Sequence, residues 1–230
     1  MSATGMSSTP PAPKVSDPPL GLLGGTFDPV HKAHLKLAEE AMKQLALGGV
    51  LWIPAGSPRH RAPPMASAEH RLAMVRIAIA DHSGYSIDEG EVFSTEPSYT
   101  VPTLERLRRG HGEHKPLVLL MGADAFLGLH TWHRWRDLFR LAHIGVVSRP
   151  TFELANERMN AELADEFRHR RAERAVLTAA PAGAIVSFAM DAGTVSSTEA
   201  RTKLLQGAPV DELLPASVLD YIRRHNLYRQ

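Results

Sequence analysis

The chain has 230 residues, of which 43% are hydrophobic and 22% are charged, and its formal net charge is +1. These values are typical of a globular protein of one domain or two small ones, and they give no support for broad electrostatic binding to nucleic acid. The absence of cysteine excludes disulfides and thiolate chemistry, and it fits a cytoplasmic protein. No apolar run approaches the roughly 18 residues of a membrane span, so no membrane contact is expected.

Residues 1–19 differ in composition from the rest of the chain. They are rich in proline, serine, threonine and alanine, and they offer almost nothing to bury. We expect a disordered leader without a role in catalysis, followed by one domain over residues 20–230.

Apolar strands and amphipathic helices alternate along this domain. Strands are predicted over 20–23, 49–54, 85–93, 117–121, 143–148 and 184–190. Helices are predicted over 32–47, from 67 onward, over 103–109, within a charged stretch at about 153–175, after 196 and near the C-terminus. This order implies an α/β fold, a Rossmann-like, doubly wound parallel sheet with helices on both faces. Such sheets bind ligands beyond the carboxyl ends of their strands, where the strand order reverses.

The segment after the first strand, residues 24–35 (GGTFDPVHKAHL), is the most informative part of the chain. Asp28 and Pro29 predict a helix start, with Asp28 as the N-cap and Pro29 at the first helical position. His31 and His34 lie three residues apart and share one face of the first turns. Because the glycines permit close approach and a helix N-terminus favours anions, the two imidazoles suit phosphate oxygens.

Other interpretations of residues 24–35 have to be weighed. A glycine-rich turn alone is usually only a turn, and a histidine pair can be half of a metal site. Zinc needs three or four ligands, however, and the chain has neither a His-Glu-x-x-His motif nor a cysteine, so no protein metal site is predicted. The segment also lacks the lysine of a Walker loop and the spacing of the dinucleotide fingerprint.

A second motif lies at residues 195–201 (VSSTEAR). Ser196 and Glu199 fit a capping box, which alone indicates only a well-formed helix start. Arg201 places a cation in the first turns, where the helix dipole disfavours it. A bound anion would resolve that conflict.

Three further residues have a structural and a functional interpretation. Asp124 follows a buried strand, where an acidic residue can be a helix N-cap. Trp132 offers a flat face for a ring, although a single tryptophan is more often part of the core. Arg149 follows another strand and is either a phosphate contact or a solvated side chain. We assign Trp52 and Trp135 to the core.

The two motifs together resemble a known family. Residues 24–35 resemble the Gly-Gly-x-Phe-Asp-Pro-x-His-x-Gly-His signature of the nucleotidyltransferase α/β-phosphodiesterase superfamily, most closely the bacterial nicotinate mononucleotide adenylyltransferases. Residues 195–201 resemble that family's Ile-Ser-Ser-Thr-x-Ile-Arg motif, and the resemblance covers about residues 20–229. Ala33 stands where the family usually has glycine, and we expect only a slightly tighter fit at the nucleotide.

The resemblance implies adenylyl transfer from ATP to nicotinate mononucleotide by direct attack, giving the dinucleotide and pyrophosphate. It assigns charge stabilisation at the phosphates to His31, His34 and Arg201. It assigns ATP binding to Gly24, Gly25, Thr26, Phe27, Gly122, Asp124, Arg149, Ser197 and Thr198. It assigns the mononucleotide to His60, Arg61, Thr100, Trp132 and His133. Magnesium is expected as the cofactor, bound mainly through ATP phosphates and water, because no carboxylate cage is visible.

Three alternatives stay open. One is a superfamily member with another acceptor, nicotinamide mononucleotide or phosphopantetheine, although the motifs at Thr100 and Trp132 favour a pyridine nucleotide. The second is a nucleotide-binding regulator without catalysis, against which the two histidines and Arg201 argue. The third is a metal-binding structural protein. The sequence does not decide the oligomeric state, and a homo-oligomer is one of the alternatives.

Overall fold

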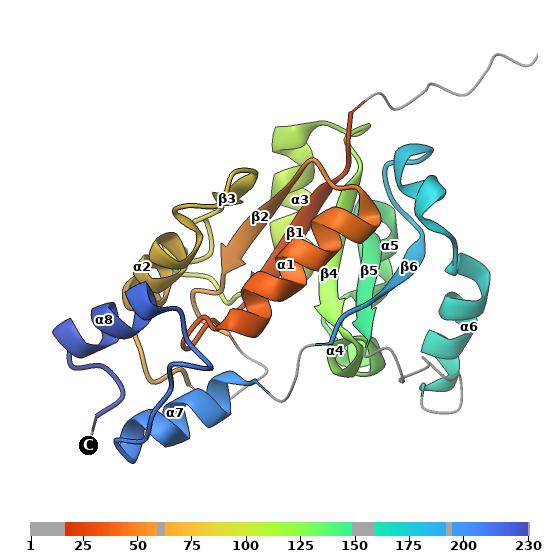
Figure 1. Cartoon of the computed structure of the whole chain (residues 1–230). Coiled ribbons are helices and arrows are strands. Elements are labelled where there is room, and N and C mark those ends of the chain that lie inside the picture. The colour runs from red at the N-terminus through yellow and green to blue at the C-terminus, as the bar shows by residue number, and fades with distance from the viewer. Residues whose placement is uncertain (1–16, 59–62, 149–158, 192–194, 230) are drawn as a thin grey trace, which may run out of the picture.

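The computed structural model describes residues 17–58, 63–148, 159–191 and 195–229 (Figure 1). The strands in this part of the chain are β1 (Leu20–Gly25), β2 (Gly49–Pro54), β3 (Tyr85–Ile87), β4 (Leu117–Gly122), β5 (His143–Ser148) and β6 (Ile185–Ala189). The α-helices there are α1 (Lys32–Leu45), α2 (Ala68–Ile79), α3 (Thr100–His111), α4 (Ala123–Leu127), α5 (Leu138–Leu141), α6 (Ala161–Arg170), α7 (Ser197–Leu205) and α8 (Ala216–Arg224). Short 3-10 helices are η1 (Leu129–Thr131), η2 (Trp135–Asp137) and η4 (Arg174–Thr178).

The strands form one parallel sheet in the order β3-β2-β1-β4-β5-β6. Leu20 of β1 pairs with Gly49 of β2 on one side and with Leu117 of β4 on the other. The chain therefore runs outward in opposite directions from β1 and from β4, which makes their carboxyl ends the switch point of the sheet. The predicted single-domain α/β fold with a doubly wound parallel sheet is confirmed.

Helices bury both faces of the sheet, and the strand pleat sends neighbouring residues to opposite faces. Leu23 belongs to the cluster that α1, α2 and α8 cover, whereas Leu22 belongs to the cluster under α3, α5 and α6. Figure 1 shows α1 in front of the sheet and α3 and α5 behind it. Because both faces are covered, the strands read as continuous apolar runs.

Several predicted boundaries differ from the structure. The strand predicted over 85–93 ends at Ile87, because the amides of Val92 and Phe93 bond back to the carbonyl of Glu89. Phe93 is consequently 69% exposed. The helix predicted from 103 begins earlier, at Thr100. The charged helix predicted within 153–175 is the shorter α6, and residues 149–158 lie outside the described part of the chain.

Residues 17–19, the end of the predicted leader, contact the domain. The carbonyl of Pro19 accepts a hydrogen bond from the Gly48 amide at 2.8 Å, and Asp17 lies 3.5 Å from the Lys115 ammonium. Residues 1–16 are not described, so for them the division of the chain stays a prediction. None of the helices described above combines the length and the apolar character that a membrane crossing requires.

Candidate active site

The loop between β1 and α1 does not start the helix as predicted. The N-cap of α1 is His31, and the helix begins at Lys32, so the predicted cap role of Asp28 and the first helical position of Pro29 are both wrong. The peptide bond between Asp28 and Pro29 is cis. The Asp28 carboxylate points into the protein, where the residue is 4% exposed and accepts hydrogen bonds from other segments. These long-range partners outweigh a local cap.

The two histidines lie together at the start of α1, as predicted. Their rings stack with centroids 3.6 Å apart, and the His31 amide donates to Nδ1 of His34 at 3.2 Å. A neutral His34 ring that accepts at Nδ1 carries its proton on Nε2. Burial lowers the pKa of His31 to about 4. Without a ligand, burial thus favours a neutral His31 ring, which can donate or accept a hydrogen bond, and its part in offsetting phosphate charge stays a prediction.

The Asp28 carboxylate joins three segments in a buried network. Oδ2 accepts from the Met65 amide at 2.8 Å, and Oδ1 accepts from the Ala66 amide at 3.1 Å. The Tyr228 hydroxyl, from the end of the chain, donates to Oδ1 at 2.7 Å. Hydrogen bonds to a carboxylate are stronger than those between neutral groups, so these donors fix the β1–α1 loop to the segment before α2 and to the C-terminus.

Arg201 reaches the same loop from α7. Its Nη1 donates to the Asp28 carbonyl at 2.7 Å and lies 3.8 Å from Oδ2 of that residue. The predicted cap at the start of α7 is present, because Oγ of Ser196 accepts from the Glu199 amide at 3.2 Å. The unfavourable position of this cation is thus already offset by Asp28, a contribution that sequence reasoning assigned to a bound anion alone.

The first residues of α7 complete the contact between the two motifs. The Ser197 hydroxyl donates to the Pro29 carbonyl at 3.0 Å, and Nη2 of Arg201 donates to Oγ1 of Thr198 at 3.3 Å. Figure 1 shows α7 at the end of the sheet toward which the arrows of β4 and β5 point. The fold therefore brings together residues that are far apart in sequence, at the edge where such sheets bind ligands.

Glycines leave room at the switch point. A Cβ atom on Gly24 of β1 or on Gly122 of β4 would meet nothing within 4 Å. Asp124 is exposed in the first turn of α4, but the N-cap of that helix is Gly122, so the predicted cap role of Asp124 is wrong. Thr26 is half-buried between β1 and the histidines. The ends of β1 and β4 thus offer backbone and open space to a ligand.

The family resemblance implied that Phe27 contacts ATP, but its ring is buried. Its ring is 2% exposed and packs 5.0 Å from the His34 ring and 5.5 Å from the Trp52 ring, centroid to centroid. A Cβ atom on Gly25 would come within 2.9 Å of the Phe27 ring. Phe27 supports the loop from the core side, so only its backbone can face a nucleotide.

Arg71 of α2 is a residue of this site that sequence reasoning missed. The side chain is 1% exposed, and Nη1 donates to the carbonyls of Thr26, at 2.7 Å, and of Ala55. Nη2 donates to the Gly56 carbonyl at 2.9 Å. The guanidinium fork thereby holds the loops that follow β1 and β2 next to each other.

The sequence did contain a signal for Arg71. Met74, Val75 and Ala78 follow it at three, four and seven positions, and all three are buried. Arg71 therefore occupies a place on the apolar stripe of α2, where a charged residue needs partners in the interior.

The residues implied in mononucleotide binding lie on neighbouring loops. Thr100 begins α3, and the Tyr99 ring lies 4.9 Å from the ring of His133. Trp132 is half-buried against the core that α3 covers, whereas His133 is exposed. The Ser98 hydroxyl accepts hydrogen bonds from residues 56–57 and ties the loop after β2 to this region. His60, Arg61 and Arg149 lie outside the described residues.

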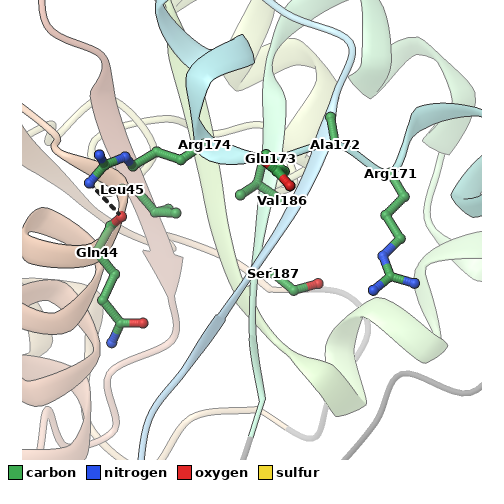
Figure 2. Close-up of a pocket in the computed structure, with 8 residues that line it drawn as sticks. All are labelled: Gln44, Leu45, Arg171, Ala172, Glu173, Arg174, Val186 and Ser187. Atoms are coloured by element: carbon green, nitrogen blue, oxygen red, sulfur yellow. Dashed lines mark hydrogen bonds between the residues drawn. The ribbon is translucent and has the colours of Figure 1, made fainter.

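A separate hollow of about 520 Å³ lies beside β6 (Figure 2). Gln44 and Leu45 of α1, residues 171–174, and Val186 and Ser187 of β6 line it. Figure 2 shows the guanidinium groups of the two arginines in 171–174 on either side of β6, with Arg174 bonded to the Gln44 carbonyl. None of the predicted site residues within the described part of the chain lines this hollow.

Comparison with known proteins agrees with this geometry. Residues 22–203 match the family model described as cytidylyltransferase-like. The probable nicotinate-nucleotide adenylyltransferase of Dechloromonas aromatica is 56% identical over 92% of this chain and 98% of its own length. The probable nicotinate-nucleotide adenylyltransferase of Methylococcus capsulatus is 41% identical over 91% of this chain and 99% of its own length.

Among solved structures, the nicotinic acid mononucleotide adenylyltransferase of Plasmodium falciparum has a similar fold. Its complex with APC superposes with a TM-score of 0.66 at 17% identity, covering 92% of this chain and 97% of that one. Its complex with NaAD gives a TM-score of 0.65. Fold, site and family model together define a nucleotidyltransferase. The chain belongs to the nicotinate-nucleotide adenylyltransferase family.

Proposed function

We propose that this chain transfers the adenylyl group of ATP to nicotinate mononucleotide. A phosphate oxygen of the mononucleotide attacks the α-phosphorus, the bond from that phosphorus to the bridging oxygen breaks, and nicotinate adenine dinucleotide and pyrophosphate leave. The contact between the β1–α1 loop and the start of α7 carries the proposal. It brings the imidazoles of His31 and His34 and the guanidinium of Arg201 to the carboxyl ends of the strands. Family membership supports the same reaction.

Charge stabilisation and positioning suffice for this chemistry, because the acceptor itself is the nucleophile. Arg201 supplies a permanent positive charge toward the phosphates. Nε2–H of His34 supplies a hydrogen bond, and the neutral His31 ring supplies a second polar contact. Both imidazoles stand at the N-terminus of α1, whose dipole favours an anion.

For ATP, the open space at Gly24 and Gly122 supports a nucleotide across the ends of β1 and β4. The first turn of α7, with Ser197 and Thr198, borders the same edge. We also propose ATP contacts for Gly25, Thr26 and Asp124. Phe27 could contact ATP only through its backbone. We keep Arg149 as a contact to the ATP phosphates on the basis of the sequence alone.

For the acceptor, we place the pyridine ring on Trp132, near Thr100 and His133. Backbone N–H groups of these loops would pair with both oxygens of the nicotinate carboxylate, which only accept hydrogen bonds. In nicotinamide mononucleotide the same N–H groups would meet the NH₂ of the amide, which is a donor. His60 and Arg61 are retained for the mononucleotide phosphate on the family pattern alone.

Enzymes of this family usually use a divalent metal ion, and we propose magnesium here. Among the described residues, no group of three His, Asp or Glu side chains could hold a metal ion. The Asp28 carboxylate is already committed to its three donors. The ion would therefore be carried by ATP phosphates and water, where it offsets phosphate charge. A cytoplasmic location and the oligomeric state stay predictions.

One assay tests this function. Purified protein is incubated with ATP, magnesium and, in turn, nicotinate mononucleotide, nicotinamide mononucleotide or phosphopantetheine, and pyrophosphate is measured. We expect the fastest release with nicotinate mononucleotide. The His34→Ala variant, purified identically, shows how much signal comes from contaminating enzymes. Equal or faster use of another acceptor would contradict the proposed substrate.

A further inference from the structure

Tyr228 lies near the end of the chain, in a segment whose sequence indicates only packing. It is 5% exposed, and its hydroxyl donates to Oδ1 of Asp28 at 2.7 Å. Burial raises the pKa of this hydroxyl far above its usual value, and the hydrogen bond and the charge of Asp28 raise it further. Tyr228 therefore keeps its proton near neutral pH and donates it to Asp28.

Asp28 connects Tyr228 to Arg201. Its Oδ2 lies 3.8 Å from Nη1 of Arg201, which is too long for a hydrogen bond, while Nη1 bonds instead to the Asp28 carbonyl at 2.7 Å. The carboxylate is held back by its other donors, the Tyr228 hydroxyl and the amides of Met65 and Ala66. The guanidinium is thus anchored to the loop without being locked into a close ion pair.

We propose that Tyr228 is a positioning residue for adenylyl transfer. Its hydroxyl holds the Asp28 carboxylate away from Arg201, so that the guanidinium keeps its charge available to the phosphates of ATP. This role rests on the proposed function, and it assigns a part in the reaction to the C-terminal segment.

The Tyr228→Phe variant removes the hydroxyl and keeps the buried ring. Oδ1 then retains only the Ala66 amide at 3.1 Å and Oδ2 the Met65 amide at 2.8 Å, so two donors instead of three hold the carboxylate back from a direct ion pair with Arg201. Because a guanidinium paired with this carboxylate offers less charge to the phosphates, we expect kcat/KM for ATP to fall about tenfold or more. The KM for nicotinate mononucleotide should change less than about twofold, since Thr100 and Trp132, where we place the pyridine ring, lie on other segments than the donors to Asp28.

Tyr221→Phe is the matched control. Tyr221 lies on α8 in the same C-terminal region, and its hydroxyl is 2.9 Å from Nδ1 of His70. It takes no part in the Asp28 network, so this variant loses a hydroxyl of the same kind without touching Arg201. We expect wild-type kinetics. Thermal unfolding of both variants sets an assay temperature at which each is fully folded.

A double-mutant cycle with Arg201→Lys decides whether Tyr228 acts through Arg201. Contacting residues that act together are not additive, so removing the hydroxyl should cost less than about threefold in the Arg201→Lys background. A loss of equal size in both backgrounds, or a folded Tyr228→Phe variant within twofold of wild type, would overturn the proposal.

The wild-type chain separates this proposal from the proposed function. A wild type that releases no pyrophosphate with nicotinate mononucleotide contradicts the function itself. In that case calorimetric titration with ATP still tests Tyr228: weaker ATP binding in Tyr228→Phe but not in Tyr221→Phe supports the positioning role, and equal binding in all three proteins contradicts it.

Discussion

The phosphate side and the acceptor side of the site are built differently. On the phosphate side, Asp28 and Arg71 are buried and make hydrogen bonds to several segments. On the acceptor side, Trp132 is half-buried and His133 is exposed, and Ser98 joins the segment before α3 to the loop after β2. Reaction chemistry needs donors held in place before the substrate arrives, whereas recognition of an acceptor tolerates loops that adjust. Substitutions on the two sides should therefore affect different kinetic constants.

The largest effect is expected on the phosphate side from His34→Ala. The variant loses the Nε2–H donor, and removing one donor of developing charge costs about a hundredfold or more in kcat. The fold should survive, because His34 is not in the apolar core. Steady-state kinetics measure the loss, with His111→Ala, at the exposed end of α3, as control. Near wild-type turnover in folded His34→Ala would remove this residue from the mechanism.

Arg201→Ala should lower kcat/KM for ATP by about a hundredfold, since a permanent charge toward the phosphates is lost. From the sequence alone, loss of a cation at a helix start would preserve or raise stability. The contacts of Arg201 with Asp28 reverse that expectation, and we expect the melting temperature without ligand to fall by a few degrees. A melting temperature above that of wild type would show that these contacts contribute nothing.

On the acceptor side, Trp132→Ala should raise the KM for nicotinate mononucleotide about tenfold, because base stacking on an aromatic ring contributes roughly 1–3 kcal/mol. The KM for nicotinamide mononucleotide should rise by a similar factor, since stacking does not distinguish a carboxylate from an amide. Comparing kcat/KM for both acceptors in wild type and variant checks this. A collapsed ratio would mean that Trp132 itself provides selectivity.

The smallest effect is expected from truncating the N-terminal segment, which belongs to neither side of the site. Deleting residues 1–16 should leave turnover and melting temperature unchanged, because this composition offers nothing to bury. Deleting 1–19 should leave turnover unchanged but lower the melting temperature slightly, because Pro19 bonds to Gly48 and Asp17 pairs with Lys115. Equal melting temperatures for the two truncations would show that residues 17–19 add no stability, and lost activity in either would bring the leader into the site.

Much of the fold follows from local sequence patterns. The apolar runs of β2, β4 and β5 predict buried parallel strands, because a strand covered on both faces has no polar positions to reveal. The cap at Ser196 depends on its own backbone neighbour and is likewise present in the structure. The apolar pattern predicted a strand through residues 89–93, and this was wrong. A turn closed by hydrogen bonds to the Glu89 carbonyl takes its place.

The environment of the site depended on tertiary structure. Asp28 and Pro29 form a plausible helix start in sequence, yet the carboxylate is bound by Met65, Ala66 and Tyr228, which only the fold brings near. The low pKa of His31 is a consequence of burial, which no spacing reveals. Sequence by itself determined which side chains are present and which strands and helices carry them, because propensity and periodicity act between near neighbours. Only the folded chain decided their partners and charges, because hydrogen bonding and desolvation act between residues that are close in space.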